Sequence, residues 1–105
     1  MGYCEIMNSF TFTSPLWKYS GESAWHFLTL PLDVSARIKF LQSGRRGFGS
    51  VRVLATLGKS TFETSVFPDS KSRCYLLPVK ASVRKAEKIG HGDEVACLIE
   101  LRDKL

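Results

Sequence analysis

Basic side chains gather in two parts of this sequence, and their spacing favours a site for a negatively charged partner. Lys80, Arg84 and Lys88 recur at every fourth position, which places them on one face if the segment is helical. Clustered lysine and arginine attract phosphate groups by electrostatic steering and by counterion release. We therefore expect a nucleic acid, or another polyanion such as a phosphorylated ligand, to contact a set of six basic residues: Lys80, Arg84, Lys85, Lys88, Arg45 and Arg46.

The overall charge leaves a second interpretation of these residues open. The formal net charge of the chain is +5 at pH 7. A charge of this size is also typical of a solvated face that keeps a small domain in solution. The sequence contains no intact motif of a known nucleic-acid-binding module.

A second group of side chains could line a pocket at the mouth of a small barrel. Its members are hydroxyl groups in a predicted strand and aromatic rings beside predicted turns, namely Trp25, Phe48, Thr64 and Ser65. Together with Lys80 or Arg84 they would make the protein a small-molecule binder or an enzyme of minor activity. A third alternative is a protein–protein interaction module, which an exposed apolar patch or an unpaired strand edge would favour.

Residue types that usually carry catalysis are sparse. The two histidines, His26 and His91, are not spaced with a cysteine or serine as a nucleophile and its base would be. The three cysteines are odd in number and widely spaced, which argues against a disulfide framework and a zinc site. We therefore favour a non-enzymatic protein without a metal or other cofactor.

The elements that must position these residues follow from hydrophobic periodicity. Alternating apolar residues predict six strands, at residues 8–19, 25–30, 50–57, 61–67, 73–77 and 95–101. One helix is predicted after Asp33, a candidate N-cap, because Val34, Ile38 and Leu41 form a helical stripe. A second helix is predicted to start directly after Pro78, and glycine at position 90 would end it.

This order, ββαβββαβ, predicts a mainly β fold, a small closed six-stranded barrel with two short helices. Several strands carry apolar residues on both faces, which suits closure into a barrel that helices cover. The 105 residues are expected to form a single domain over residues 1–105. No apolar run is long enough to span a membrane, and the first residues do not resemble a secretory signal. We expect a cytoplasmic protein and no membrane partner; the oligomeric state stays open.

Four ordered motifs resemble a family of small bacterial and archaeal proteins catalogued as a domain of unknown function, some of which are fused to a YdeI/OmpD-associated segment. The motifs are residues 25–31 (WHFLTLP), 47–53 (GFGSVRV), 64–68 (TSVFP) and 75–86 (YLLPVKASVRKA), the last followed by Gly92 and Asp93. The resemblance runs from about Phe10 to Leu101. It implies a small closed β-barrel, no established activity and no catalytic residues. Phe48 and Phe62 stand where the family is expected to have tryptophan.

Overall fold

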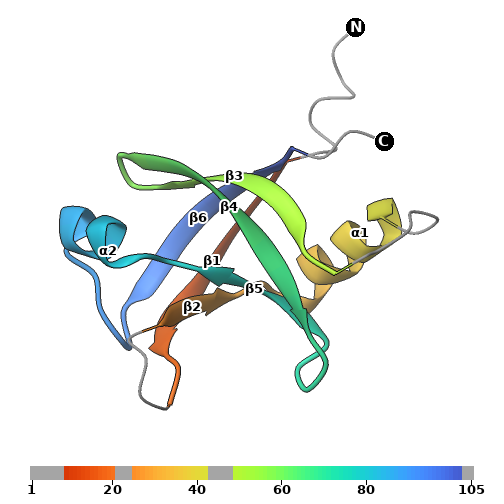
Figure 1. Cartoon of the computed structure of the whole chain (residues 1–105), viewed down its shortest axis with the longest axis horizontal. Helices are drawn as coiled ribbons and strands as arrows, with labels where there is room; N and C mark the ends of the chain where they lie inside the picture. Colours follow the sequence, from red (N-terminus) through yellow and green to blue (C-terminus); the bar gives the residue numbers. More distant parts are fainter. Residues whose placement is uncertain (1–8, 21–24, 43–48, 103–105) are drawn as a thin grey trace, which may run out of the picture.

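The chain folds into a closed antiparallel barrel of six strands with one helix at either end (Figure 1). The computed structural model describes residues 9–20, 25–42 and 49–102. The strands are β1 (Ser9–Lys18), β2 (His26–Thr29), β3 (Val51–Leu57), β4 (Ser60–Asp69), β5 (Cys74–Pro78) and β6 (Glu94–Leu101). The helices are α1 (Leu32–Gln42) and α2 (Ala81–Glu87). Around the barrel the strand order is β1-β2-β5-β4-β3-β6, and both the fold class and the element order predicted from the sequence are confirmed.

Alternation along the strands builds the core of the barrel. In β6 the side chains of Val95, Cys97 and Ile99 are buried, while the residues between them are exposed. In β3 every second residue from Val51 to Leu57 is buried in the same way. Each large aliphatic side chain that is fully removed from water contributes about 1.5–3 kcal/mol. The apolar interior is therefore the main source of the barrel's stability.

Helix α1 begins two residues earlier than the sequence predicts, at Leu32 and not directly after Asp33. The carbonyl of Pro31 accepts the N–H of Ser35 at 2.8 Å, so Asp33 lies inside the first turn and is not the N-cap. Its carboxylate still accepts the N–H of Val34, at 2.9 Å, and a negative charge in this turn favours the helix. The predicted stripe is buried at Val34 and Ile38, which face the barrel.

Helix α2 is shorter than predicted, since it begins at Ala81 and not directly after Pro78. Val79 remains extended because its N–H donates to the carbonyl of His26 at 2.9 Å, which continues the pairing with β2. Lys80 is the extended N-cap residue, and Lys88 ends the helix in the left-handed conformation with φ 57. These two lysines are therefore the cap residues that flank the helix, and of the expected basic stripe only Arg84 lies within α2.

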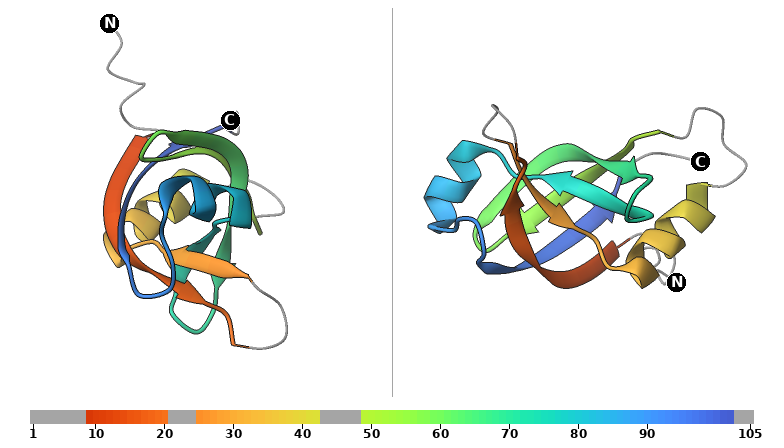
Figure 2. Two further views of the ribbon diagram at one scale, coloured as in Figure 1. Left: turned by 90° about the vertical axis from the view of Figure 1, so that its left-hand side faces the viewer. Right: turned by 90° about the horizontal axis from the view of Figure 1, so that it is seen from below.

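The two helices lie at opposite ends of the barrel (Figures 1 and 2). Helix α1 packs near β5, and α2 packs near β4. Neither of these helices is long and apolar enough to cross a membrane.

Candidate functional site

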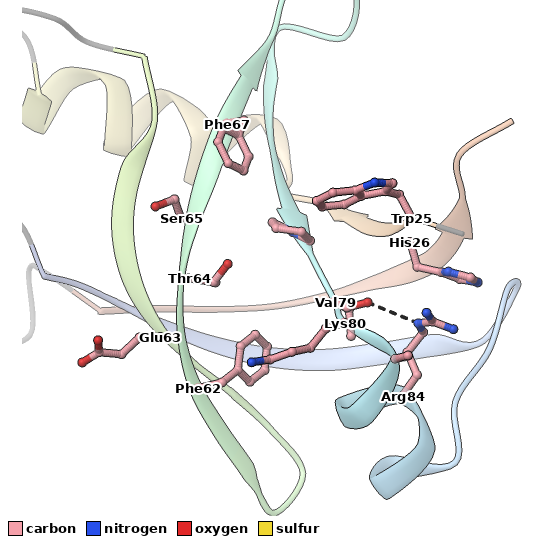
Figure 3. Close-up of a pocket in the computed structure, with 12 residues that line it drawn as sticks. Trp25, His26, Phe62, Glu63, Thr64, Ser65, Phe67, Val79, Lys80 and Arg84 are labelled. Carbon is pink, nitrogen blue, oxygen red and sulfur yellow. Dashed lines mark hydrogen bonds between the residues drawn. The ribbon is translucent and has the colours of Figure 1, made fainter. Parts of the chain in front are cut away.

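The barrel wall opens between β4 and β5 on the side of α2. The two strands pair only at Phe67 with Leu76, Pro68 with Tyr75 and Asp69 with Cys74. If this register continued, Pro78 would lie opposite Ser65, and proline has no N–H to extend the ladder. The strands diverge from this point toward α2 (Figure 3).

A pocket of about 580 Å³ occupies the opening. Its walls come from β4, from the beginning of β2 and from the segment that joins β5 to α2. The lining residues are Trp25, His26, Phe62, Glu63, Thr64, Ser65, Phe67, Pro78, Val79, Lys80, Ala81 and Arg84. The concave shape and the mixture of apolar and polar groups are typical of ligand sites.

Residues from both groups singled out in the sequence meet in this pocket. Trp25, Thr64 and Ser65 line it together with Lys80 and Arg84. Their role in binding stays a prediction. Lys85 of α2 and the C-cap residue Lys88 are exposed and do not line the pocket. Three candidates lie outside the described residues: Arg45, Arg46 and Phe48.

One wall of the pocket is cationic. The ammonium nitrogen of Lys80 lies 5.9 Å from the centre of the Phe62 ring, within the range of a cation–π interaction. The guanidinium of Arg84 is held by its Nε, which donates to the carbonyl of Val79 at 3.2 Å (Figure 3). Two positive charges are thus placed at the same end of the pocket, beside α2.

The acidic residue of the lining is directed away from these cations. Glu63 and Ser65 project to one side of β4, and Thr64 projects to the other, toward the pocket (Figure 3). The carboxylate of Glu63 lies 3.8 Å from a guanidinium nitrogen of Arg102. The potential beside Lys80 is therefore not neutralised by this carboxylate.

Aromatic rings form the opposite part of the lining. Trp25 is 55% exposed, and its ring stacks on Phe27 with centroids 5.9 Å apart and planes 11° apart. Phe67 is 44% exposed on β4. Stacking on Phe27 restrains the indole, so a flat or apolar group that enters the pocket meets an ordered surface.

Sequence reasoning assigned most aromatic rings to the core and so missed Phe62 and Phe67 as lining residues. The signal that could have found them is the presence of apolar residues on both faces of the segment from residue 62 to 67. A strand that is buried on one face only needs apolar residues on that face alone. His26 also lines the pocket, as a largely buried side chain.

The hydroxyl groups and the metal-ligating side chains near the pocket have few mutual contacts among the described residues. The described residues include no hydrogen bond from Thr64 or Ser65 to a histidine, which an activated hydroxyl nucleophile would need. Over the same residues, no three side chains of metal-ligating type form a cluster. What the arrangement offers is two fixed cations, hydroxyl groups and apolar rings around a cavity.

The comparison with known families agrees with the resemblance seen in the sequence motifs. Residues 12–99 match the family model described as "Domain of unknown function (DUF1905)". No curated protein matches the chain.

Proposed function

The chain belongs to the DUF1905 family, and we propose that it is a binding module that takes an anionic ligand into the pocket between β4 and α2. The observation that carries the proposal is that Lys80 and Arg84 line a cavity together with the aromatic rings of Trp25, Phe62 and Phe67. A ligand that fits has a phosphate or carboxylate group and an apolar part beside it. Charged hydrogen bonds to such a group are roughly twice as strong as neutral ones.

The cation–π geometry at Lys80 supports this proposal. Its ammonium sits over Phe62 at the rim of a cavity, so a ligand can approach it from the open side. The nearest carboxylate of the lining, on Glu63, points away and lies close to Arg102. An incoming anion therefore replaces water at Lys80 and does not have to displace Glu63.

A second candidate is a nucleic acid that tracks along the outside of α2, and the exposure of Lys85 and Lys88 favours it. In that case the phosphate contacts would be shared among all the basic residues of the segment. Such contacts fix the position of a nucleic acid without selecting its sequence. The two candidates differ in which lysines matter, because Lys80 lines the pocket and Lys85 does not.

Amide chemical shifts distinguish the two candidates. The ¹⁵N-labelled protein is titrated at ~50 mM salt with pentathymidylate, inorganic pyrophosphate and a blocked heptapeptide of alternating glutamate and valine. We expect at least one probe to shift the amides of Phe62, Thr64 and Lys80, and to be released as salt is raised. The absence of any shift with all three probes would contradict the proposal.

A matched pair of charge reversals supplies the control. Lys80→Glu is expected to lower the affinity for the tightest-binding probe by roughly tenfold or more, because it places a carboxylate beside the bound anion. Lys85→Glu changes the net charge by the same amount and is expected to change the affinity by less than about twofold. Equal losses in both variants would favour the outside of α2 as the binding surface.

A further inference from the structure

Strand β4 is paired along most of one edge and along only a short part of the other. On one side it pairs with β3 from Ser60 to Val66. On the other side its pairing with β5 is confined to the last three residues, from Phe67 to Asp69. Within the described residues, the edge before Phe67 has no strand partner on the side of β5.

The parity of the ladder identifies the backbone groups on that edge. In an antiparallel strand, residues that exchange hydrogen bonds with one neighbour alternate with residues that point to the other. Phe67 and Asp69 point to β5, because Pro68 between them has no N–H and fits the position that does not bond there. By the same parity, the N–H and C=O groups of Thr61, Glu63 and Ser65 point away from β3, toward the pocket.

These backbone groups form a regular row beside the cations. The distance from residue 61 to residue 65 along a strand is about 13 Å. Thr64 and Phe62 alternate with the residues of the row and direct their side chains to the pocket side (Figure 3). The pocket therefore combines an unpaired strand edge, apolar side chains on one face, and Lys80 with Arg84 at one end.

We propose that the anionic ligand is an extended acidic peptide segment that adds as a strand to the edge of β4, between β4 and α2. The inference rests on the binding function proposed above and names its ligand. A peptide backbone presents donors and acceptors in the alternation that Thr61, Glu63 and Ser65 require, and this mode of recognition is known as β-augmentation. A phosphate or a nucleic acid offers acceptors but cannot satisfy the C=O groups of the row in the same register.

The positive charges in the pocket determine which kind of peptide can bind at the edge of β4. An acidic side chain on the added strand meets Lys80, whose ammonium lies over Phe62 beside the edge of β4 (Figure 3). Arg84 lines the same pocket beyond Val79 and adds to the positive potential there. A second copy of this chain that paired through the same edge would bring two sets of these cations together, which disfavours it. Because side chains alternate along a strand, every second residue of the peptide would face Phe62 and Lys80, and the others would face away.

The test starts from a display library of random seven-residue peptides selected on the intact protein. We expect the selected peptides to share acidic residues and β-branched or aromatic residues. On binding the synthesised peptide, the amides of Thr61, Glu63 and Ser65 should slow in hydrogen exchange by tenfold or more. The amides of Phe62 and Thr64 serve as internal controls, since they point to β3 and are expected to be protected already.

Two variants and a modified ligand test the backbone contacts. Ser65→Pro removes an N–H on the pocket side and leaves the bonds to β3 in place, so it should abolish peptide binding. Ser65→Ala removes the same hydroxyl but keeps that N–H, so a loss of binding as large as that of Ser65→Pro would overturn the backbone contact. If Ser65→Pro fails to fold, N-methylation of the peptide decides: methyl groups on alternate nitrogens of one parity should abolish binding, and those of the other parity should not.

The outcomes separate this inference from the proposed function. The peptide proposal is overturned if pyrophosphate or pentathymidylate binds at the pocket but no peptide is selected, or if the selected peptide does not protect the amides of Thr61, Glu63 and Ser65. That result would still support the proposed anion site. Selected peptides without acidic residues, or insensitive to backbone methylation, overturn the peptide proposal as well. The absence of binding by every probe overturns both.

Discussion

The carboxylate of Glu87 accepts a hydrogen bond from the hydroxyl of Ser60, at 2.5 Å, and so ties the end of α2 to the beginning of β4. The N–H of Lys59 donates to the same carboxylate oxygen at 3.3 Å. These residues are 27 or more positions apart in the sequence. The tie therefore sets how far the end of α2 stands from the beginning of β4.

Loss of the Glu87 carboxylate should loosen this connection. We expect Glu87→Ala to lower the free energy of unfolding by about 1 kcal/mol, because hydrogen bonds to the hairpin disappear from a partly exposed site. Denaturant unfolding measures the change. Glu87→Gln retains an acceptor oxygen and should lose less; a double-mutant cycle with Ser60→Ala should show that the two losses are not additive. Additive losses would mean that the two groups do not interact.

Gly58 is required by the turn between β3 and β4. Its φ of +58 lies in the left-handed region, and a Cβ there would meet the carboxylate of Glu87. Gly58→Ala should therefore cost about 1–2 kcal/mol for the backbone conformation, and it should also displace Glu87 from Ser60. Gly49 is a suitable control, because a Cβ there meets no atom within 4 Å and its φ is not in the left-handed region. A Gly49→Ala loss as large as that of Gly58→Ala would contradict this explanation.

Ser35 links α1 to the strands through one buried hydroxyl. The side chain is 2% exposed, donates to the carbonyl of Leu30 at 3.3 Å and accepts the N–H of Tyr75 at 3.0 Å. Ser35→Ala would leave that N–H buried without its partner, and we expect a loss of about 1–3 kcal/mol in unfolding free energy. Ala36 is exposed on the same helix, so Ala36→Ser is the matched surface substitution and should change stability by less than about 0.5 kcal/mol.

The buried thiol of Cys97 predicts sensitivity to alkaline pH. Burial raises the pKa of Cys97 from its ordinary 9.0 to about 12, and burial also raises the pKa of Tyr75. Since the thiol ionises more readily in the unfolded chain, its contribution to stability is complete below pH 9.0 and declines as pH rises toward 12. The decline reaches at most about 1.4 kcal/mol for each pH unit.

Unfolding free energies of the native protein and of Cys97→Ala, measured between pH 8 and pH 11, test this prediction. The variant is expected to start from a lower stability, because a small cavity replaces the sulfur. Its stability should then fall less steeply with pH than that of the native protein. Parallel pH profiles would show that the ionisation of Cys97 does not contribute.

Periodicity was sufficient to predict the strands, since burial in β3 and β6 follows the alternation of the sequence from Val51 to Leu57 and from Val95 to Ile99. The boundary of β4 was not predicted. The sequence predicts a strand over residues 61–67, yet β4 continues through Pro68 to Asp69. Proline is accepted there because its nitrogen occupies a position that bonds to neither neighbouring strand, which depends on the register and not on the local sequence.

The chemistry of the candidate site was easier to predict than its geometry. Lys80, Arg84 and Thr64 were recognised individually as residues that could bind a ligand. Their meeting in one pocket depends on the divergence of β4 from β5, which occurs where Pro78 interrupts the ladder. Pairing of Val79 with β2 also makes α2 begin later than predicted, so that of the predicted basic stripe only Arg84 lies within the helix and Lys80 is its N-cap.

The pairing of β1 with β6 places the first and last described strands next to each other, with Ser9 opposite Glu100. A barrel whose outermost segments are neighbours can be spliced into a surface loop of another protein without stretching either junction. For the same reason, the barrel is a candidate for circular permutation, with new termini opened in the hairpin at Gly58 and Lys59. Joining the ends of β1 and β6 with a linker would keep all the strand pairs of the barrel. The folding kinetics of the permuted protein would show which strand pair forms last.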